Sequence, residues 1–372
     1  MNAVCDNVSR DKKRVDIASG SFGEGLQMLG SDLDIMWVLQ FIEVHDTTTS
    51  KVVNHIKPYL SLTTDDTKPG FAMLRLVSSP YSGILKICEQ FKRDFYLSNV
   101  LFKTIFLSED AQLVHGPCIS DVNGLVDIAV CLHNKSWIQL ASQWNTRSNY
   151  SWPKKNIKQM IINHGVLFVP IGDKGSPHED LEWRISFSVG ERFLIYTFSH
   201  TQLLCYALMK ILLKDAIDTD NKCKDLLCSY YMKTIIFWIS EELQPSVWTP
   251  ADLIPCFMRC FSRLIYCVQY QVCPHYFIPE NNLFENKIEG LARDNLIDKL
   301  RMLFSYGWRC ILFSKQISNN LVLPYNVQRN QSYLNYDDIN KFLKSKLFFR
   351  VSALGVEHND VSRVVYDLIS CT

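Results

Sequence analysis

A glycine-rich turn followed by a short apolar strand is the feature of this sequence that most restricts its fold. Residues 19–25 read Ser-Gly-Ser-Phe-Gly-Glu-Gly, and residues 30–39 read Gly-Ser-Asp-Leu-Asp-Ile-Met-Trp-Val-Leu. Side chains alternate between the two faces of a strand, so Asp32 and Asp34 share one face and the apolar residues take the other. Two carboxylates beside a turn rich in N–H groups predict a site for a divalent metal and a phosphate.

A second apolar strand carries the third carboxylate that such a site needs. Residues 125–132 read Leu-Val-Asp-Ile-Ala-Val-Cys-Leu, and Asp127 is the one charged residue among them. A charge in an apolar run needs a partner or a metal, and two-metal phosphoryl transfer uses carboxylates that converge on ions roughly 4 Å apart. We therefore predict a metal triad of Asp32, Asp34 and Asp127. The alternative is that each aspartate caps a neighbouring segment or lies at a strand end.

These motifs resemble those of a known family. Gly20-Ser21, the Asp32-x-Asp34 pair and Asp127 on a later strand are similar to the nucleotidyltransferase pattern. The wider set is similar to the Mab-21-like proteins, which include the cGAS-like receptors (cGAS is cyclic GMP-AMP synthase). These motifs lie at residues 20–26, 30–36, 182–188 and 228–234, and the resemblance spans roughly residues 15–310.

The resemblance implies an α+β fold in two lobes. A mixed β-sheet with flanking helices would carry the three carboxylates, and a C-terminal helical lobe of the HhH/H2TH-like type would close a cleft over them. The expected divisions are a polar N-terminal arm over residues 1–14, a nucleotidyltransferase core over residues 15–199 and a Mab-21 helical domain over residues 200–372. The cleft is then the expected site.

The resemblance also implies an activity. Such an enzyme would use Mg²⁺ or Mn²⁺ to join two nucleoside triphosphates, such as ATP and GTP, into a 2′,3′-cGAMP-like cyclic dinucleotide. It would act as an innate immune sensor upstream of STING, with double-stranded RNA as the expected activator. Two alternatives stay open: a catalytically silent scaffold or binding protein of the same fold, and a linear polymerase of the poly(A) type.

Further residues match family positions that bind the nucleotides. They are Ser19, Ser21, Arg184, Ser186, Lys210, Ser229 and Tyr230. By resemblance, Lys210 would contact the triphosphate and Tyr230 would stack on a base. Arg184 could hold a phosphate or a purine edge, or lie on an exposed polar strand face. Lys210 could instead extend its amine to solvent.

Composition restricts the choice of partner. Of the 372 residues, 47% are hydrophobic and 21% are charged, which is typical of a globular protein. The net charge of +1 gives no overall basic field, so nucleic-acid binding requires a local patch. The densest basic segment beside an aromatic residue holds Arg147, Lys154, Lys155 and Lys158. This segment predicts either a nucleic-acid groove or an ordinary solvated surface.

The 13 cysteines follow no repeating framework, which favours a cytoplasmic protein with reduced thiols. No apolar run approaches the ~18 residues of a membrane span. Five candidate zinc ligands lie close together in the sequence: Cys256, Cys260, Cys267, Cys273 and His275. The first three of these, the cysteines, are separated by four and by seven residues. This spacing favours one buried helix face over a zinc site. Only Cys205 lies near His200, so the paired cysteines of the family's DNA-gripping zinc insertion are missing.

Periodicity predicts the remaining elements. Strands are expected over residues 71–77, 165–170 and 182–188, and helices over residues 201–213, 227–239, 250–272 and 289–308. Apolar residues at steps of three and four predict one more helix within residues 81–106.

Overall fold

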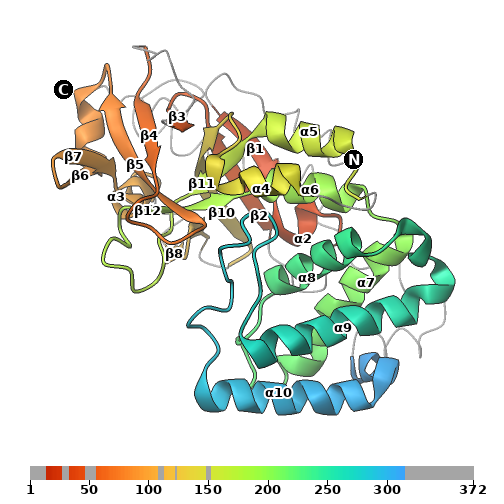
Figure 1. Cartoon of the computed structure of the whole chain (residues 1–372). Helices are drawn as coiled ribbons and strands as arrows, with labels where there is room; N and C mark the ends of the chain where they lie inside the picture. Colours follow the sequence, from red (N-terminus) through yellow and green to blue (C-terminus); the bar gives the residue numbers. More distant parts are fainter. Residues whose placement is uncertain are drawn as a thin grey trace. The chain divides into compact units, whose positions relative to one another are not determined.

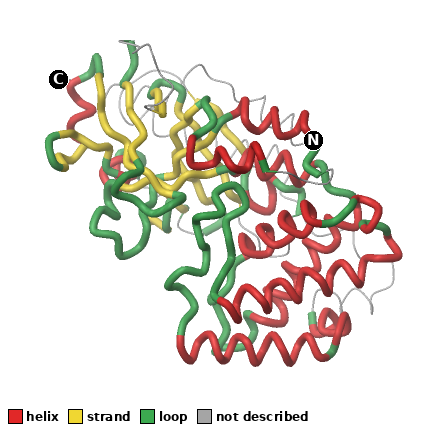
Figure 2. The backbone as a smooth tube through the Cα atoms, viewed as in Figure 1, coloured by secondary structure: helices red, strands yellow, loops and turns green. Residues whose placement is uncertain are grey.

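The computed structural model describes residues 14–26, 33–46, 56–107, 113–121, 124–147 and 152–314. These residues fall into two compact units. The first holds the described residues up to 140 together with 160–192, and the second holds 141–159 and 193–314. All named strands lie in the first unit and the longest helices in the second (Figures 1 and 2), which confirms the α+β class. Segment 141–159, which we expected in the nucleotidyltransferase core, belongs to the helical unit.

The first unit is built on a mixed sheet whose main path runs β1-β2-β10-β11-β12-β5-β4-β3. Its strands are β1 (Arg14–Ala18), β2 (Leu33–Leu39), β3 (Glu43–Asp46), β4 (Tyr59–Thr63), β5 (Phe71–Ser78), β10 (Val126–Asn134), β11 (Val166–Val169) and β12 (Glu182–Ser186). Two hairpins branch from it: β6 (Cys88–Phe91) with β7 (Asp94–Leu97), and β8 (Leu113–His115) with β9 (Cys118–Ser120). Within the described residues, β2 with β10 and β3 with β4 are the parallel pairs.

Strands β2 and β10 each have a neighbouring strand on both sides, and most of their apolar residues are buried. Six of the seven residues of β2 are buried, and Asp34 is the one that keeps partial contact with solvent. In β10, residues 129–132 are buried, whereas Asp127 and Ile128 are partly exposed. The charged positions therefore lie toward the N-terminal ends of two parallel strands, where burial is incomplete.

The helix predicted within residues 81–106 is wrong. The segment forms a 3₁₀ turn, η1 (Ser82–Ile87), then the β6–β7 hairpin, then the short helix α3 (Asn99–Thr104). At the hairpin turn Lys92 has a φ of 56°, and β7 pairs with β5 of the main sheet. Ile84, Ile87 and Cys88 are buried, but Phe95 on β7 is exposed, so the helix-like spacing of the apolar residues is a coincidence.

Helices make up most of the second unit. The α-helices of the described residues, in both units, are α2 (Gly20–Gly23), α3, α4 (Ser142–Thr146), α5 (Lys155–His164), α6 (Ser188–Tyr196), α7 (His200–Ile211), α8 (Ser229–Glu242), α9 (Leu253–Tyr270) and α10 (Gly290–Ser305). The four helices predicted beyond residue 200 are confirmed, as are the strands over 71–77 and 165–170. The strand predicted over 182–188 ends at Ser186, and α6 begins at Ser188.

The cysteines of α9 pack as apolar residues. Cys256, Cys260 and Cys267 are buried on one face of the helix, as their spacing predicted. His275 is occupied by other contacts: its Nδ1 accepts from the backbone N–H of Phe277 (3.2 Å) and Ile278 (3.1 Å). The interpretation of these cysteines as a helix face is therefore confirmed.

Candidate active site

Two of the three predicted carboxylates lie side by side in the sheet. Asp34 on β2 and Asp127 on β10 are direct partners in the parallel register. Partners on neighbouring strands lie about 4.8 Å apart and point to the same face of the sheet. Both side chains keep partial contact with solvent. The third predicted carboxylate, Asp32, lies outside the described residues.

The glycine-rich turn approaches the carboxylate of Asp34. The backbone N–H of Ser19 donates to the carbonyl oxygen of Asp34 (2.9 Å), which holds the end of β1 against β2. A single helical turn, α2, follows at Gly20. Gly20 has a φ of 58°, and a Cβ atom there would lie 1.8 Å from Oδ2 of Asp34. Only glycine therefore allows the turn, which includes the predicted phosphate ligands Ser19 and Ser21, to come this close.

A serine that the sequence analysis missed holds the other carboxylate. Strand β9 pairs with β10 so that Ser120 faces Asp127, and the Ser120 hydroxyl donates to Oδ1 of Asp127 (2.5 Å). The hairpin between them is closed by Asp121, whose Oδ1 accepts from two backbone N–H groups. The dipeptide Asn123-Gly124, a typical hairpin signal, could have predicted this pairing.

Two proposed nucleotide ligands lie on β12, separated from β10 by β11. Arg184 is exposed, whereas Trp183 and Ile185 are buried, so Arg184 lies on the exposed face of the strand. The Oγ of Ser186 accepts from the backbone N–H of Ser188 (3.3 Å). Arg184 thus has the exposure that a ligand-binding residue needs, but Ser186 also takes part in the turn into α6.

The remaining residues predicted to bind nucleotide belong to the helical unit. Lys210 on α7 is only 2% exposed, so the alternative that it extends to solvent is wrong. Its Nζ lies 5.5 Å from the centroid of the Tyr206 ring. Ser229 is exposed at the first position of α8. The hydroxyl of Tyr230 contacts Nε2 of His275 (2.7 Å), so this ring is already oriented by a neighbour.

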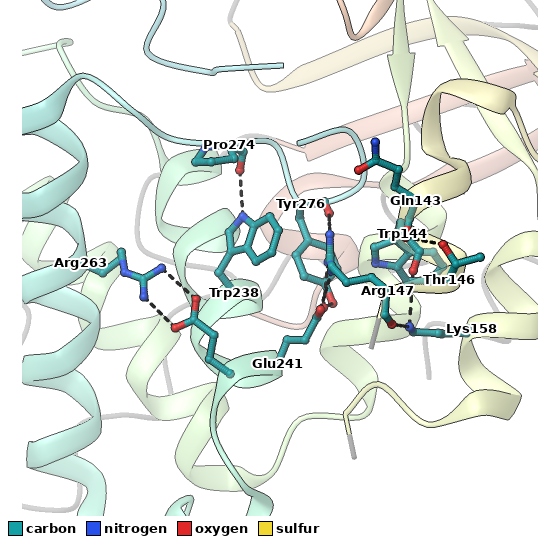
Figure 3. A network of polar contacts seen from close by, with 11 residues as sticks. Gln143, Trp144, Thr146, Arg147, Lys158, Trp238, Glu241, Arg263, Pro274 and Tyr276 are labelled. Carbon is teal, nitrogen blue, oxygen red and sulfur yellow. Dashed lines mark hydrogen bonds and ion pairs between the residues drawn. The ribbon is translucent and has the colours of Figure 1, made fainter. Parts of the chain in front are cut away.

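The predicted basic patch is wrong for two of its four members. Arg147 is bound to Glu241 through Nε (2.5 Å) and Nη2 (2.8 Å), and it donates to the carbonyl of Tyr276 (3.1 Å) (Figure 3). Lys158 is 8% exposed and donates to the carbonyl oxygen of Arg147 (3.0 Å). Both cations stabilise the helical unit. Lys154 and Lys155 are exposed, as predicted.

The donor chemistry of the sheet site fits a hard cation. Asp34 and Asp127 offer carboxylate oxygens, which are the ligands that Mg²⁺ and Mn²⁺ prefer. Zinc sites use thiolate or imidazole ligands more often. Within the described parts of the chain, no group of three or more His, Cys, Asp or Glu side chains is arranged to hold a metal.

None of the described helices has the length and apolar character to cross a bilayer.

Two comparisons with known proteins found similarities. The Mab-21 protein HhH/H2TH-like domain matches residues 202–302, which run from α7 into α10. Cyclic GMP-AMP synthase of Mus musculus is 26% identical over 177 residues. The chain is thus similar to Mab-21 proteins in its helical part and to cyclic GMP-AMP synthase over less than half of its length. The match covers 44% of this chain and 34% of the mouse enzyme, so the chain aligns with about a third of that relative's length. The mixed sheet with an HhH/H2TH-like helical part is consistent with an α+β nucleotidyltransferase-like fold.

Proposed function

We propose that this Mab-21/cGAS-like chain is a metal-dependent nucleotidyltransferase that joins two nucleoside triphosphates into a cyclic dinucleotide. The observation that supports this most directly is the parallel pairing of Asp34 with Asp127 beside Gly20. The pairing combines two carboxylates, a tight turn and partial exposure in one place. A scaffold protein would not need charged side chains at adjacent positions of a buried sheet.

The carboxylates would hold Mg²⁺ or Mn²⁺, with Asp32 as the proposed third ligand. Such ions supply positive charge to the triphosphate and lower the pKa of the attacking hydroxyl. Ser120 occupies Oδ1 of Asp127, which leaves Oδ2 to face the ligand. A fixed carboxylate orients the acceptor ribose hydroxyl for in-line attack on the α-phosphate of the donor.

The turn that contains Ser19 and Ser21 would bind the donor phosphates through backbone N–H and hydroxyl groups. Arg184 and Ser186 are proposed contacts to the nucleotide from β12. Lys210, Ser229 and Tyr230 are proposed contacts from the helical unit, with Lys210 on the triphosphate and Tyr230 on a base. A buried ammonium such as that of Lys210 is worth more to an anion than an exposed one.

The proposed substrates are ATP and GTP, and the proposed product is a cGAMP-like cyclic dinucleotide that acts upstream of STING. Double-stranded RNA is the proposed activator. Of the predicted basic segment, Lys154 and Lys155 remain as candidates for RNA contact because they are exposed. The chain's similarity to cyclic GMP-AMP synthase supports these proposals at the level of the family.

Product analysis tests the proposal. The full chain is incubated with ATP, GTP, CTP and UTP, with Mn²⁺ and with or without double-stranded RNA, and the products are identified by mass spectrometry. Asp34→Asn and Asp127→Asn should each abolish product while circular dichroism stays unchanged. Asp94→Asn is the control, because Asp94 forms a half-exposed ion pair with Arg75 (3.4 Å) on the β7 hairpin.

Each outcome of this experiment decides between the candidate functions. Cyclic products that vanish in both site variants, but not in the control, support the proposal. Linear products would indicate a polymerase. Wild-type protein that gives no product with any activator, and does not bind Mn²⁺, would be a silent scaffold. Turnover that is unchanged in Asp127→Asn would exclude this carboxylate from catalysis.

A further inference from the structure

The helical unit contains a pocket between α8, α9 and the loop after α9, with a volume of about 240 Å³. A cavity of roughly 150 Å³ holds one benzene ring, so this pocket has room for a ring with a substituent or for a small bicyclic ring. The described residues that line it include none of the proposed nucleotide ligands. The pocket is therefore a second candidate site in this chain.

Trp238 on α8 forms an aromatic wall of the pocket, and its indole is held in place. The indole Nε1 donates to the carbonyl oxygen of Pro274 (2.9 Å) (Figure 3). The guanidinium carbon of Arg147 lies 4.2 Å from the centroid of the indole ring. Arg147 is in turn fixed by its two contacts with Glu241. A fixed and partly exposed indole offers a flat surface on which another aromatic ring can stack.

The other uncharged residues of the pocket are Ile235, Cys267, Cys273 and Pro274. Ile235 and the two cysteines are buried, and buried thiols pack as small apolar groups. Contact between such a surface and an unpaired charge costs free energy, whereas contact with an aromatic ring is favourable. The lining therefore selects a ligand whose body is an apolar ring.

One side of the pocket presents opposite charges next to each other. Arg263 on α9 and Glu242 on α8 both line it and form a two-pronged ion pair, with Nη1–Oε1 at 3.1 Å and Nη2–Oε2 at 2.7 Å. Both side chains remain partly exposed. A guanidinium offers only donors and a carboxylate only acceptors. A ligand group that carries an acceptor beside a donor matches this pair, whereas an anion or a cation meets a like charge.

We propose that this pocket binds a small, neutral aromatic molecule with an amide edge, either a primary amide or the lactam of a heterocycle. The ring stacks on Trp238. The amide carbonyl accepts a hydrogen bond from Arg263, and the amide N–H donates to Glu242. The proposal goes beyond nucleotide joining, because it assigns to the helical unit a ligand site made of other residues.

Benzamide is the probe that tests the site, with benzoate and benzylamine as charged probes of the same ring size. The full chain is isotope-labelled at the indole nitrogens and titrated by nuclear magnetic resonance. Benzamide should shift the Trp238 signal saturably; among the eight indole signals it is the one that Trp238→Phe removes. Benzoate and benzylamine, which is protonated at neutral pH, should each bind about tenfold more weakly because of the like charge in the pair. Tighter binding of either charged probe would overturn the amide edge.

Variants of the ion pair locate the polar contact. Arg263→Ala and Glu242→Ala should each weaken benzamide binding about tenfold, the effect of losing one hydrogen bond to a charged group. Arg301→Ala is the matched control, because Arg301 also donates to a residue of α9, Gln269 (3.2 Å), but does not line the pocket. Circular dichroism checks that each variant is folded. Should Trp238→Phe not fold, the affinities of these variants, measured by calorimetry, decide. Absence of saturable benzamide binding to the wild type, or equal affinity in all three alanine variants, would overturn the proposal.

Discussion

The carboxylate of Asp34 lies against the α-carbon of Gly20, so close that a Cβ atom at residue 20 would come within 1.8 Å of Oδ2. The contact joins the glycine-rich turn to the strand that carries the proposed metal ligand. Gly20 also has a φ of 58°, which other L-residues rarely adopt. The position of the Asp34 carboxylate therefore depends on the absence of a side chain at Gly20, which lies after the end of β1.

Replacing Gly20 with alanine should displace Asp34. We expect nucleotide joining to fall by about 100-fold, the effect of a misplacement near 1 Å, with a loss of stability of about 1–2 kcal/mol from the left-handed backbone. Gly25→Ala is the matched control, because Gly25 has a φ of 72° but nothing within 4 Å of its added Cβ. Turnover and urea unfolding are measured for both. Equal activity in the two variants would contradict a role for the Gly20–Asp34 contact.

Ser120 is expected to position Asp127 rather than touch substrate. Removing its hydroxyl in Ser120→Ala should lower Mn²⁺ affinity and turnover by about 10–100-fold, as loss of a ligand's supporting hydrogen bond does. Ser120→Thr should restore part of both. Ser61→Ala serves as the control, since Ser61 is a buried serine of β4 whose Oγ has no hydrogen-bond partner among the described residues. Unaltered Mn²⁺ binding in Ser120→Ala would argue against this role.

The sequence predicted the elements whose pattern comes from burial on both faces or on one helix face. Strands β2 and β10 read as apolar runs because they lie inside the sheet, and α9 shows its buried cysteines at helical spacing. The β6–β7 hairpin was missed because short elements can bury apolar residues at steps of three and four without forming a helix. Local periodicity carries no information about strand pairing, and the pairing decides whether such a segment forms a helix or a hairpin.

The candidate site shows the same limit. Asp34 and Asp127 stood out because a charge in an apolar strand is unusual, but their register depends on residues nearly a hundred positions apart. Lys158 looked like a surface lysine, yet it is buried because the fold brings the carbonyl oxygens of Trp144 and Arg147 to its ammonium. Backbone acceptors carry no sequence signal, so the burial of this lysine could not be predicted.

Glu241 and Glu242 are neighbours on α8 that form Arg–Glu ion pairs of different burial. Glu241 accepts from buried Tyr276 (2.6 Å) as well as from Arg147, whereas the Glu242–Arg263 pair is partly exposed. Glu241→Gln should cost about 3–5 kcal/mol because it leaves Arg147 without its counter-charge. Glu242→Gln should cost about 0–1 kcal/mol. Urea unfolding of both variants checks this, and similar midpoints would show that burial does not separate the pairs.

Lys154 and Lys155 are the exposed part of the predicted basic segment. Reversing both charges, with Lys154→Glu and Lys155→Glu together, should weaken double-stranded RNA binding. The slope of log affinity against log salt concentration should fall in magnitude by about one for each lost phosphate contact. Thermal stability should not change, because neither side chain is buried. Lys174→Glu, at another exposed lysine, is the control. RNA affinity that does not depend on salt, or that is unchanged in the double variant, would move the RNA site elsewhere.

His133 on β10 should make the fold sensitive to acid. Burial, and next the nearby charge of His164, lower its pKa from 6.5 to about 4, and its ring Nε2 lies 2.7 Å from the carbonyl oxygen of His164. The unfolded chain binds a proton at this residue below about pH 6.5, whereas the folded chain resists it until about pH 4. Stability should therefore fall as the pH drops through this window, by up to about 3 kcal/mol from His133. The free energy of unfolding, measured with urea at several pH values across the window, should depend less on pH in His133→Gln than in the wild type. His200→Gln, at an exposed histidine, is the control. Identical slopes in wild type and His133→Gln would show that another group carries the acid sensitivity.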